Sequence, residues 1–228
     1  MIRDIVPPEV VVEETFEDLP DVELFPEEEA VIAKAVAKRR REFTTARACA
    51  RAALEKIGVP PVPILPGPRG APQWPAGVVG SITHCAGYRA CAVARACEIV
   101  TIGLDAEPHD SLPSGVLEAI ALPAEQTRLS ALRAVRPDIC WDRMLFCAKE
   151  SVYKAWFPLT HRWLGFEEAS IEIDPVNGSF SAGLLVDGPV VNNSVLTGFE
   201  GRWLVDDGFI VTAIAIPRVS APNLNRSS

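Results

Sequence analysis

Apolar side chains recur at helical spacing in the segment WDRMLFCAKESVYKAWF, residues 141–157. Positions three or four residues apart form one stripe on a helix, here Trp141, Leu145, Ala148, Val152 and Ala155. The same geometry places four further side chains on other faces: Lys149, Glu150, Tyr153 and Lys154. We therefore predict a long helix, opened by Pro137 and Asp138, that buries the stripe and turns its charged residues away from it.

Alternating and β-branched residues predict strands in three other regions. The segment EIVTIGLDAEP, residues 98–108, is typical of a strand, and its period of two puts Asp105 and Glu107 on the same face. Residues 78–84 and 89–96 predict two strands around an Ala86-Gly87 turn. Toward the C-terminus, EEASIEID and SFSAGLLV flank Asn177-Gly178, and GRWLV and FIVTAIAI flank Asp206-Asp207-Gly208. Both pairs predict hairpins.

The remaining segments predict helices and loops. Residues 1–29 carry mostly acidic charge, and we expect an extended lead-in anchored by Phe16, Leu19, Leu24 and Phe25. A helical pattern begins at Pro26, with Glu27 to Glu29 in its first turn, and ends before Gly58. Residues 60–77 are rich in Pro and Gly and predict a loop with fixed turns. A short helix, a break at Pro123 and a second helix follow residue 108, and the last ten residues are expected to be loose.

Each half of the chain thus runs helices first and antiparallel strands afterwards, which predicts the α+β class. A break near Pro108 divides the chain into residues 1–108 and 109–228. This division places Asp105 and Glu107 in one half and Glu150 in the other. A metal ion held by all three would align the two halves.

Composition narrows the possible functions. The chain has 228 residues and 48% hydrophobic content, which indicates a globular protein with a sizeable core. Its net charge of −8 argues against general nucleic-acid binding. No apolar run approaches the roughly 20 residues of a membrane span, and the acidic N-terminal region does not have the form of a signal peptide. The six cysteines form no C-x-x-C pair, so we expect small buried side chains in a reducing cytoplasm and no zinc site.

Asp105, Glu107 and Glu150 together form a set of oxygen ligands of the kind that Mg²⁺ takes, with waters and substrate phosphates completing the shell. Lysines beside such an ion would face the phosphates, which outlines a phosphoryl-handling site. Each part also has an ordinary explanation. Glu150 and Lys154, one helical turn apart, can be a surface ion pair worth about 0.3 kcal/mol, and Asp-x-Glu is a common polar strand end.

Three blocks of sequence taken together are more specific. FCAKESVYKAW, GLDAEP and WPAGVVGSITHCAGYRACAVA resemble the Sfp/EntD-type 4'-phosphopantetheinyl transferases, most closely their actinobacterial branch. The resemblance extends from about Phe16 to Ile216, with the motifs in the expected order. It implies two similar subdomains related by a pseudo-twofold axis, with the site in their cleft. It also implies transfer of phosphopantetheine from coenzyme A to a serine of a carrier protein, with release of 3',5'-ADP.

The resemblance also implies a site for the nucleotide of coenzyme A. KRRREFTTAR resembles the segment whose arginines hold the 3'-phosphate. Motif position assigns this role to Arg39 and Arg47, whereas helical geometry favours Arg40 with Arg47, and both alternatives stay open. A basic helix face is also often simply solvated. In the loop of residues 60–77 the one basic side chain is Arg69, and Pro66 stands where close relatives have a lysine.

GSITHCAGY resembles the block that contacts the pyrophosphate and the 3'-phosphate. His84 would act there as a donor and partial cation, and Ser81 and Thr83 would add hydroxyl donors. A single histidine at the end of a strand is otherwise more often structural, and the surrounding block is what favours the binding role.

For the reaction we assign Asp105, Glu107 and Glu150 to Mg²⁺, with Mn²⁺ as the alternative ion. Lys149 is assigned to phosphate oxygens, and Lys154 to the same oxygens or to holding Glu150. Glu150 is the candidate base for the carrier serine. Free Glu has a pKa of only about 4.3 and metal contact lowers it further, so a water on the metal is the alternative base.

The implied partners are apo acyl or peptidyl carrier domains of fatty acid, polyketide or nonribosomal peptide synthases, or of a siderophore pathway. We expect docking on the C-terminal half near the catalytic helix, where local patches matter more than the net acidity of both proteins. A built-in pseudodimer is compatible with a monomer. Two rivals stay open: a Mg²⁺-dependent hydrolase of nucleotide pyrophosphates, and an inactive carrier-binding module that would lack the metal ligands.

Overall fold

The computed structural model describes residues 1–219, so the expected loose tail lies outside the described residues except for Val219. The helices are α1 (Pro26–Ile32), α2 (Ala37–Lys56), α3 (Val116–Ile120), α4 (Pro123–Val135) and α5 (Trp141–Thr160). The strands are β1 (Val11–Thr15), β2 (Val78–Cys85), β3 (Tyr88–Arg95), β4 (Ile99–Pro108), β5 (Ala169–Asp174), β6 (Ser179–Leu184), β7 (Val190–Val191), β8 (Ser194–Val195), β9 (Gly198–Asp206) and β10 (Phe209–Pro217). Short 3-10 turns are η1 (Ile2–Ile5), η2 (Pro68–Gly70) and η3 (Phe166–Glu168).

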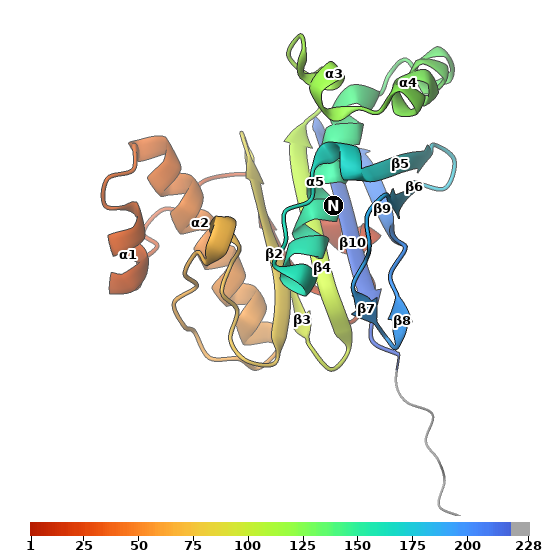
Figure 1. Cartoon of the computed structure of the whole chain (residues 1–228). Helices are drawn as coiled ribbons and strands as arrows, with labels where there is room; N and C mark the ends of the chain where they lie inside the picture. Colours follow the sequence, from red (N-terminus) through yellow and green to blue (C-terminus); the bar gives the residue numbers. More distant parts are fainter. Residues whose placement is uncertain (220–228) are drawn as a thin grey trace, which may run out of the picture.

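The strands form two main antiparallel sheets, which confirms the α+β class (Figure 1). The first sheet has the order β1-β3-β2 and the second the order β4-β10-β9-β6-β5, while β7 and β8 make a separate small hairpin. Strand β4 pairs with β10, Asp105 standing opposite Thr212. The predicted boundary at Pro108 therefore does not separate the sheets, because β4 belongs to the sheet built mainly from the second half.

Side-chain hydroxyls join the two sheets where β2 meets β4. The backbone N–H of Leu104 donates to Ser81 Oγ at 3.1 Å, and the N–H of Ala106 donates to Thr83 Oγ1 at 3.0 Å. These two hydroxyls satisfy alternate N–H groups of β4 that a neighbouring strand would otherwise pair. The seam between the two sheets thus lies directly beside Asp105.

Helix α5 lies across the second sheet and packs against β4 and β10 (Figure 1). The predicted stripe is confirmed, since all five of its residues are buried. Three hydroxyl contacts fix the helix: Thr101 Oγ1 donates to Ala155 O at 2.8 Å, Thr212 Oγ1 donates to Cys147 O at 2.9 Å, and Ser151 Oγ lies 2.6 Å from Thr212 Oγ1. Helix α5 is therefore held in one register along β4 and β10.

Gly103 is what allows α5 to lie so close to β4. A Cβ atom built at this position would come within 2.0 Å of Ser151 O and 2.7 Å of Ala155 N. We expect Gly103→Ala to lower the free energy of unfolding by about 3 kcal/mol, measured by urea denaturation, because backbone must move. Gly183→Ala on exposed β6 is the matched control, since the nearest atom to its Cβ would be 4.0 Å away. Equal stability of the two variants would contradict this packing.

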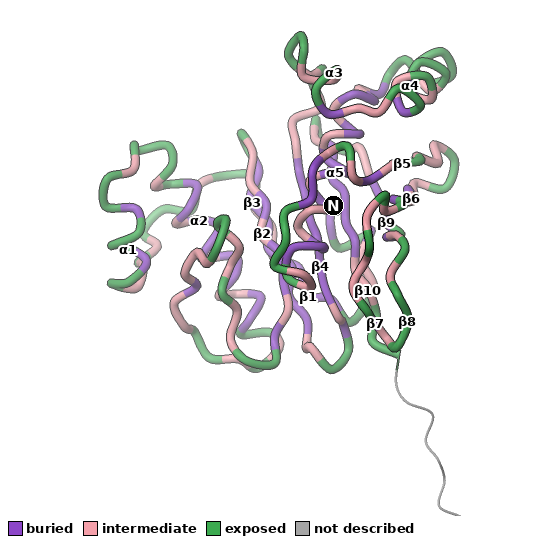
Figure 2. Tube along the Cα trace, in the orientation of Figure 1, coloured by how far each residue is buried: buried purple, intermediate pink, exposed green. Residues whose placement is uncertain are grey.

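Apolar residues of β3 divide between two cores. Cys91 and Val93 face α2 and pack with Ala50 and Leu54. The alternate positions of the same strand face β4 and β10 in a second cluster that includes Ala90, Ala92, Ile102, Leu104 and Val211. Figure 2 shows the result: buried positions concentrate in the strands and α5, whereas α3, α4 and the loop tips are largely exposed.

Several predictions of local structure are wrong. The helix expected from Pro26 is two helices, broken at residues 33–36, where the sequence has neither Gly nor Pro to mark the break. The lead-in contains β1, which pairs with β3. Phe16 and Leu19 are 43% and 40% exposed, so they are weak anchors. Helix α5 begins at Trp141 rather than at Pro137, and Cys140 precedes it.

The described residues also test two further expectations. All six cysteines are free, with three buried, but Cys97 is exposed. Among residues 1–219, no helix combines the length and hydropathy needed to cross a membrane.

Candidate functional site

The two halves of the proposed site meet at a contact between β4 and α5. Lys154 Nζ donates to Asp105 Oδ1 at 2.7 Å, and Thr83 Oγ1 donates to the same oxygen at 3.3 Å. The other oxygen, Asp105 Oδ2, is buried and has no hydrogen-bond partner among the described residues. A buried carboxylate oxygen without a partner is unfavourable, so this atom is available for a ligand.

The second acid of β4 has a partner that the sequence analysis missed. Arg143 Nη1 donates to Glu107 Oε2 at 2.9 Å, while its Nε and Nη2 donate to Asp110 O and Ser111 O. Arg143 stands seven residues before Glu150, which places both on the same face of α5. That spacing could have indicated Arg143 as a residue of the site. Arg143 holds Glu107 and the turn that follows β4.

Electrostatics show that these acids crowd one another. Burial raises the pKa of Glu150 above its ordinary value, and the nearby charge of Asp105 raises it further. The pKa of Glu107 is raised by burial and then by Asp105, with Arg143 acting in the opposite direction. Burial alone would lower the pKa of Lys154, but Asp105 outweighs that effect and raises it. The cluster therefore favours additional positive charge.

The carboxylates of Asp105, Glu107 and Glu150 are of the chemical type that binds a divalent ion. Within residues 1–219, no three His, Cys, Asp or Glu side chains are arranged as a formed metal site. Instead Lys154 is the cation at the cluster, bound to Asp105 and lowering the pKa of both glutamates. Hard oxygen ligands, one unpartnered carboxylate oxygen and two glutamates with raised pKa values match what Mg²⁺ requires.

A second polar cluster lies between α2 and the end of β2. Arg39 Nη1 donates to His84 Nε2 at 2.7 Å, which requires that nitrogen to be unprotonated. His84 Nδ1 lies 3.9 Å from Glu42 Oε2. Burial lowers the pKa of His84, and the positive charge of Arg39 lowers it further. The cluster thus presents a neutral imidazole beside an exposed guanidinium.

The other predicted arginines point elsewhere. Arg47 is buried, donates to Ile64 O at 2.7 Å and stacks on Phe43, and burial lowers its pKa to about 10. Arg40 donates to Ile32 O and to Glu29, both on α1. Of the two alternatives the structure brings Arg39, and not Arg40, to His84. Arg40 instead ties α1 to α2.

Three predicted binding residues are committed to structural contacts. Ser81 and Thr83 are buried, and their hydroxyls serve the seam with β4 rather than pointing at solvent. Lys149 is also buried: its Nζ lies 3.0 Å from Glu125 Oε2 and donates to Phe166 O and Ala169 O. The face of α5 that carries Lys149 is thus covered by α4 and by the turn after α5.

Comparison with known proteins identifies the family. The family described as the 4'-phosphopantetheinyl transferase N-terminal domain matches residues 27–94, and the 4'-phosphopantetheinyl transferase superfamily matches residues 101–192. The 4'-phosphopantetheinyl transferase Svp of Streptomyces mobaraensis is 56% identical over 219 residues, which is 95% of this chain and 89% of Svp. The chain belongs to the 4'-phosphopantetheinyl transferase superfamily.

Two further transferases give the same result. PptT of Mycobacterium tuberculosis is 52% identical over 89% of this chain and 90% of PptT. Npt of Nocardia iowensis is 52% identical over 94% of this chain and 99% of Npt. These relatives confirm the predicted resemblance and its actinobacterial branch. The hydrolase and the inactive binding module are not favoured, because each of these relatives is named a transferase.

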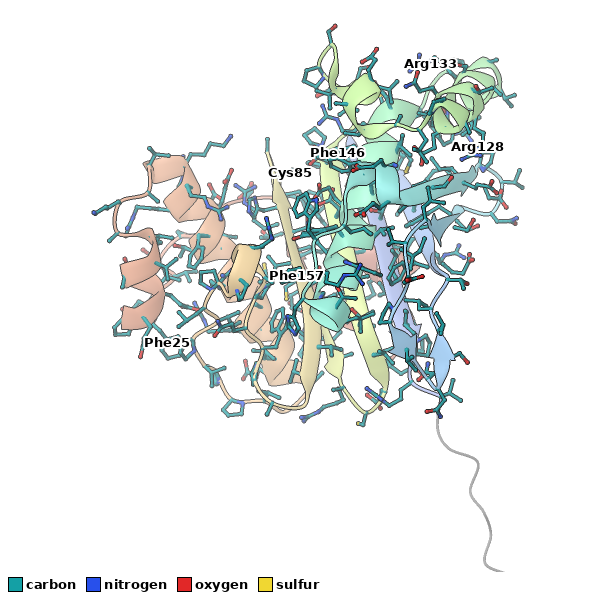
Figure 3. All side chains as sticks on the ribbon, in the orientation of Figure 1. Phe25, Cys85, Arg128, Arg133, Phe146 and Phe157 are labelled. Atoms are coloured by element: carbon teal, nitrogen blue, oxygen red, sulfur yellow. The ribbon has the colours of Figure 1, made fainter. Side chains whose placement is uncertain are left out.

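The transferase has a pocket of about 230 Å³ beside Glu150. Its lining comes from α5 and the turn after it: Lys149, Glu150, Val152, Tyr153, Trp163, Leu164, Gly165, Phe166 and Ala169. Trp163 is 56% exposed, and its ring lies 5.0 Å from that of Tyr153. In Figure 3 the labelled Phe146 and Phe157 lie on α5, one before and one after the residues that line this pocket.

Arg69 reaches this pocket from the other half of the chain. Its guanidinium lies 5.0 Å from the centre of the Trp163 ring, and its backbone is in the left-handed region with φ of 55°. Sequence analysis placed Arg69 near the nucleotide; the structure places it at the rim of the pocket. The sequence did not indicate Tyr153 and Trp163 as site residues, because an aromatic side chain in or just after an amphipathic helix is usually part of the core.

Proposed function

We propose that this transferase moves 4'-phosphopantetheine from coenzyme A to a serine hydroxyl of an apo acyl or peptidyl carrier protein, releasing 3',5'-ADP. One observation supports the proposal: Lys154 of α5 pairs with Asp105 of β4, Asp105 Oδ2 has no partner among the described residues, and the charge of Asp105 raises the pKa of both Glu107 and Glu150. The Arg39–His84 cluster is near enough for Lys154 to lower the pKa of His84. The two clusters would then hold the diphosphate and the 3'-phosphate of the same coenzyme A molecule.

Asp105, Glu107 and Glu150 would hold Mg²⁺, or Mn²⁺ in its place. The ion would neutralise charge on the diphosphate and on the leaving 3',5'-ADP. Thr83 and Arg143 orient Asp105 and Glu107 for this role through the hydrogen bonds they make. Lys154 would exchange its contact with Asp105 for phosphate oxygens.

In the proposed reaction the serine oxygen bonds to the phosphorus nearest the pantetheine, and the bond from that phosphorus to the bridging oxygen of 3',5'-ADP breaks. Glu150, or a water that it orients, takes the hydroxyl proton. Burial and the charge of Asp105 raise the pKa of Glu150, which favours proton uptake, whereas contact with the ion would act in the opposite direction.

The substrate's remaining parts fit neighbouring features. Arg39 and His84 would bind the 3'-phosphate, since both are donors at the end of β2 once His84 is protonated. The pocket beside Glu150 is lined by apolar and polar groups and would take the pantetheine arm. Arg47 would contribute positive charge to the nucleotide end without direct contact, because it is buried.

The carrier protein would dock on the second half around α5, where exposed Trp163 borders the pocket and Arg162 beside it is also exposed. We place fatty acid, polyketide, nonribosomal peptide and siderophore synthases among the systems that supply such carriers. We also propose a monomer that works in the cytoplasm, where coenzyme A is available.

Mass spectrometry of an apo carrier protein tests this function. Incubation with coenzyme A, Mg²⁺ and the transferase should add about 340 Da, one phosphopantetheine group, to the carrier. A carrier with the serine replaced by alanine is the control and should gain nothing. Release of 3',5'-ADP without any carrier would indicate a hydrolase instead, and no reaction at all would indicate an inactive binding module.

Binding of coenzyme A should take up a proton near neutral pH. His84 is neutral in the free transferase because burial and Arg39 lower its pKa, with Lys154 and Arg89 acting in the same direction and Glu42 opposing them. A bound dianionic phosphate raises that pKa, so the complex holds more protons and affinity falls as pH rises.

Calorimetry in Tris and in Hepes buffers measures the uptake as a difference in apparent binding enthalpy. The difference should vanish with 3'-dephospho-coenzyme A and in His84→Asn. If wild type binds coenzyme A with the same apparent enthalpy in both buffers, His84 does not contact the 3'-phosphate.

A further inference from the structure

Lys149, the first lysine of the AKESVYK segment, has no hydrogen-bond donor left for a substrate. Its ammonium has three N–H groups. They are directed to Phe166 O at 2.6 Å, Ala169 O at 3.0 Å and Glu125 Oε2 at 3.0 Å. The side chain is only 2% exposed. Burial lowers the pKa of Lys149, and Glu125 opposes that shift.

Glu125 is the ion-pair partner of Lys149, and both of its carboxylate oxygens also accept hydrogen bonds. Its side chain is 1% exposed, and it accepts from the N–H groups of Leu122 and Ile171, both at 2.7 Å. Leu122 is the residue just before α4, and Ile171 lies on β5. The pair of charges therefore ties together α4, α5, β5 and the turn at η3.

The segment held in this way forms a wall of the pocket beside Glu150. Phe166 and Ala169, whose carbonyls bind Lys149, also line that pocket. Glu150 is the next residue along α5, lines the same pocket, and lies near enough to Asp105 for that charge to raise its pKa. The position of Lys149 thus sets the distance between the pocket wall and the acid.

We propose that Lys149 and Glu125 are positioning residues, which fix the wall of the arm pocket relative to Glu150, and that Lys149 contacts no phosphate. This inference rests on the proposed function, because it takes the pocket to hold the pantetheine arm. It assigns Lys149 and Lys154 of one helix to different tasks: Lys154 at the phosphates, Lys149 at the wall.

A comparison of two ligands tests the assignment. Coenzyme A has both the phosphates and the arm, whereas adenosine 3'-phosphate 5'-diphosphate has the nucleotide and all three phosphates without the arm. In Lys149→Met we expect the Kd of coenzyme A to rise about 10-fold or more, because a displaced wall loses contacts with the arm. The Kd of this arm-free nucleotide should stay within about twofold of wild type. Arg133→Met, an exposed cation on α4, is the control and should change neither (Figure 3).

Two more variants keep the test decisive if Lys149→Met folds poorly. Glu125→Gln removes the other charge and should give the same split between the ligands. Lys149→Arg should behave as badly as Lys149→Met, because three acceptors within 3.0 Å of one nitrogen leave no space for a guanidinium. An arginine would instead preserve a phosphate contact.

Equal loss of affinity for both ligands in Lys149→Met, with rescue by Lys149→Arg, would overturn the positioning role. Failure of the proposed function looks different, because wild type itself would then bind coenzyme A no more tightly than the arm-free nucleotide.

Discussion

Replacing Glu150 with glutamine is expected to lower kcat/KM for carrier modification about 10³-fold. The change keeps the size of the side chain and removes one charge from the cluster with Asp105 and Glu107. The lost carboxylate serves both the proposed ion and the proposed proton transfer, so both binding of the ion and the chemical step weaken. Because burial and Asp105 raise the pKa of Glu150, its charge also costs stability at neutral pH.

Two measurements separate these contributions. The variant should melt at a higher temperature than wild type without metal, and that gain should shrink as the pH is lowered through the raised pKa of Glu150, where wild type becomes protonated. Its pH–rate profile should lose the limb assigned to the base. Exposed Glu118→Gln on α3 is the control. Activity near that of wild type would remove Glu150 from the base role.

Lys154→Met should be the most destabilising single change at the site. Lys154 is the ion-pair partner of Asp105, whose side chain is 7% exposed. Removing one member of a buried pair leaves the other charge unpaired, which costs about 3 kcal/mol. For a protein of this size that corresponds to a fall in Tm of roughly 10 °C. Thermal unfolding without metal, followed by circular dichroism, measures the loss.

The double variant Asp105→Asn/Lys154→Met is the matched control, because it contains no unpaired charge. It should be more stable than Lys154→Met alone. Saturating Mg²⁺ should also raise the Tm of Lys154→Met more than that of wild type, since the ion supplies the missing positive charge. If Lys154→Met has the same Tm as wild type, the ion pair does not stabilise the free protein.

Local patterns predicted the parts of the fold that depend on local spacing. The buried stripe of α5, the strand carrying Asp105 and Glu107 and the hairpins at Gly87, Gly178 and Gly208 follow from periodicity and turn residues. These features require no knowledge of which distant segments touch.

Long-range contacts were beyond that reasoning. Nothing in the neighbourhood of Lys149 indicates that Glu125, on another helix, will bury it. Ser81 and Thr83 looked like free donors because their role as acceptors depends on β4 lying beside β2. Arg39 and Arg40 are adjacent in sequence, and only the place of α1 decides that Arg40 is the one captured by Glu29.

The central claim is that Asp105, Glu107 and Glu150 bind one divalent ion together at the seam between β4 and α5. A crystal structure with coenzyme A and Mn²⁺, in which anomalous scattering locates the metal, tests it most directly. The account predicts one anomalous peak in contact with carboxylate oxygens of all three residues and with the diphosphate. A peak bound by Asp105 and Glu107 with Glu150 turned away, or a peak elsewhere, would contradict it.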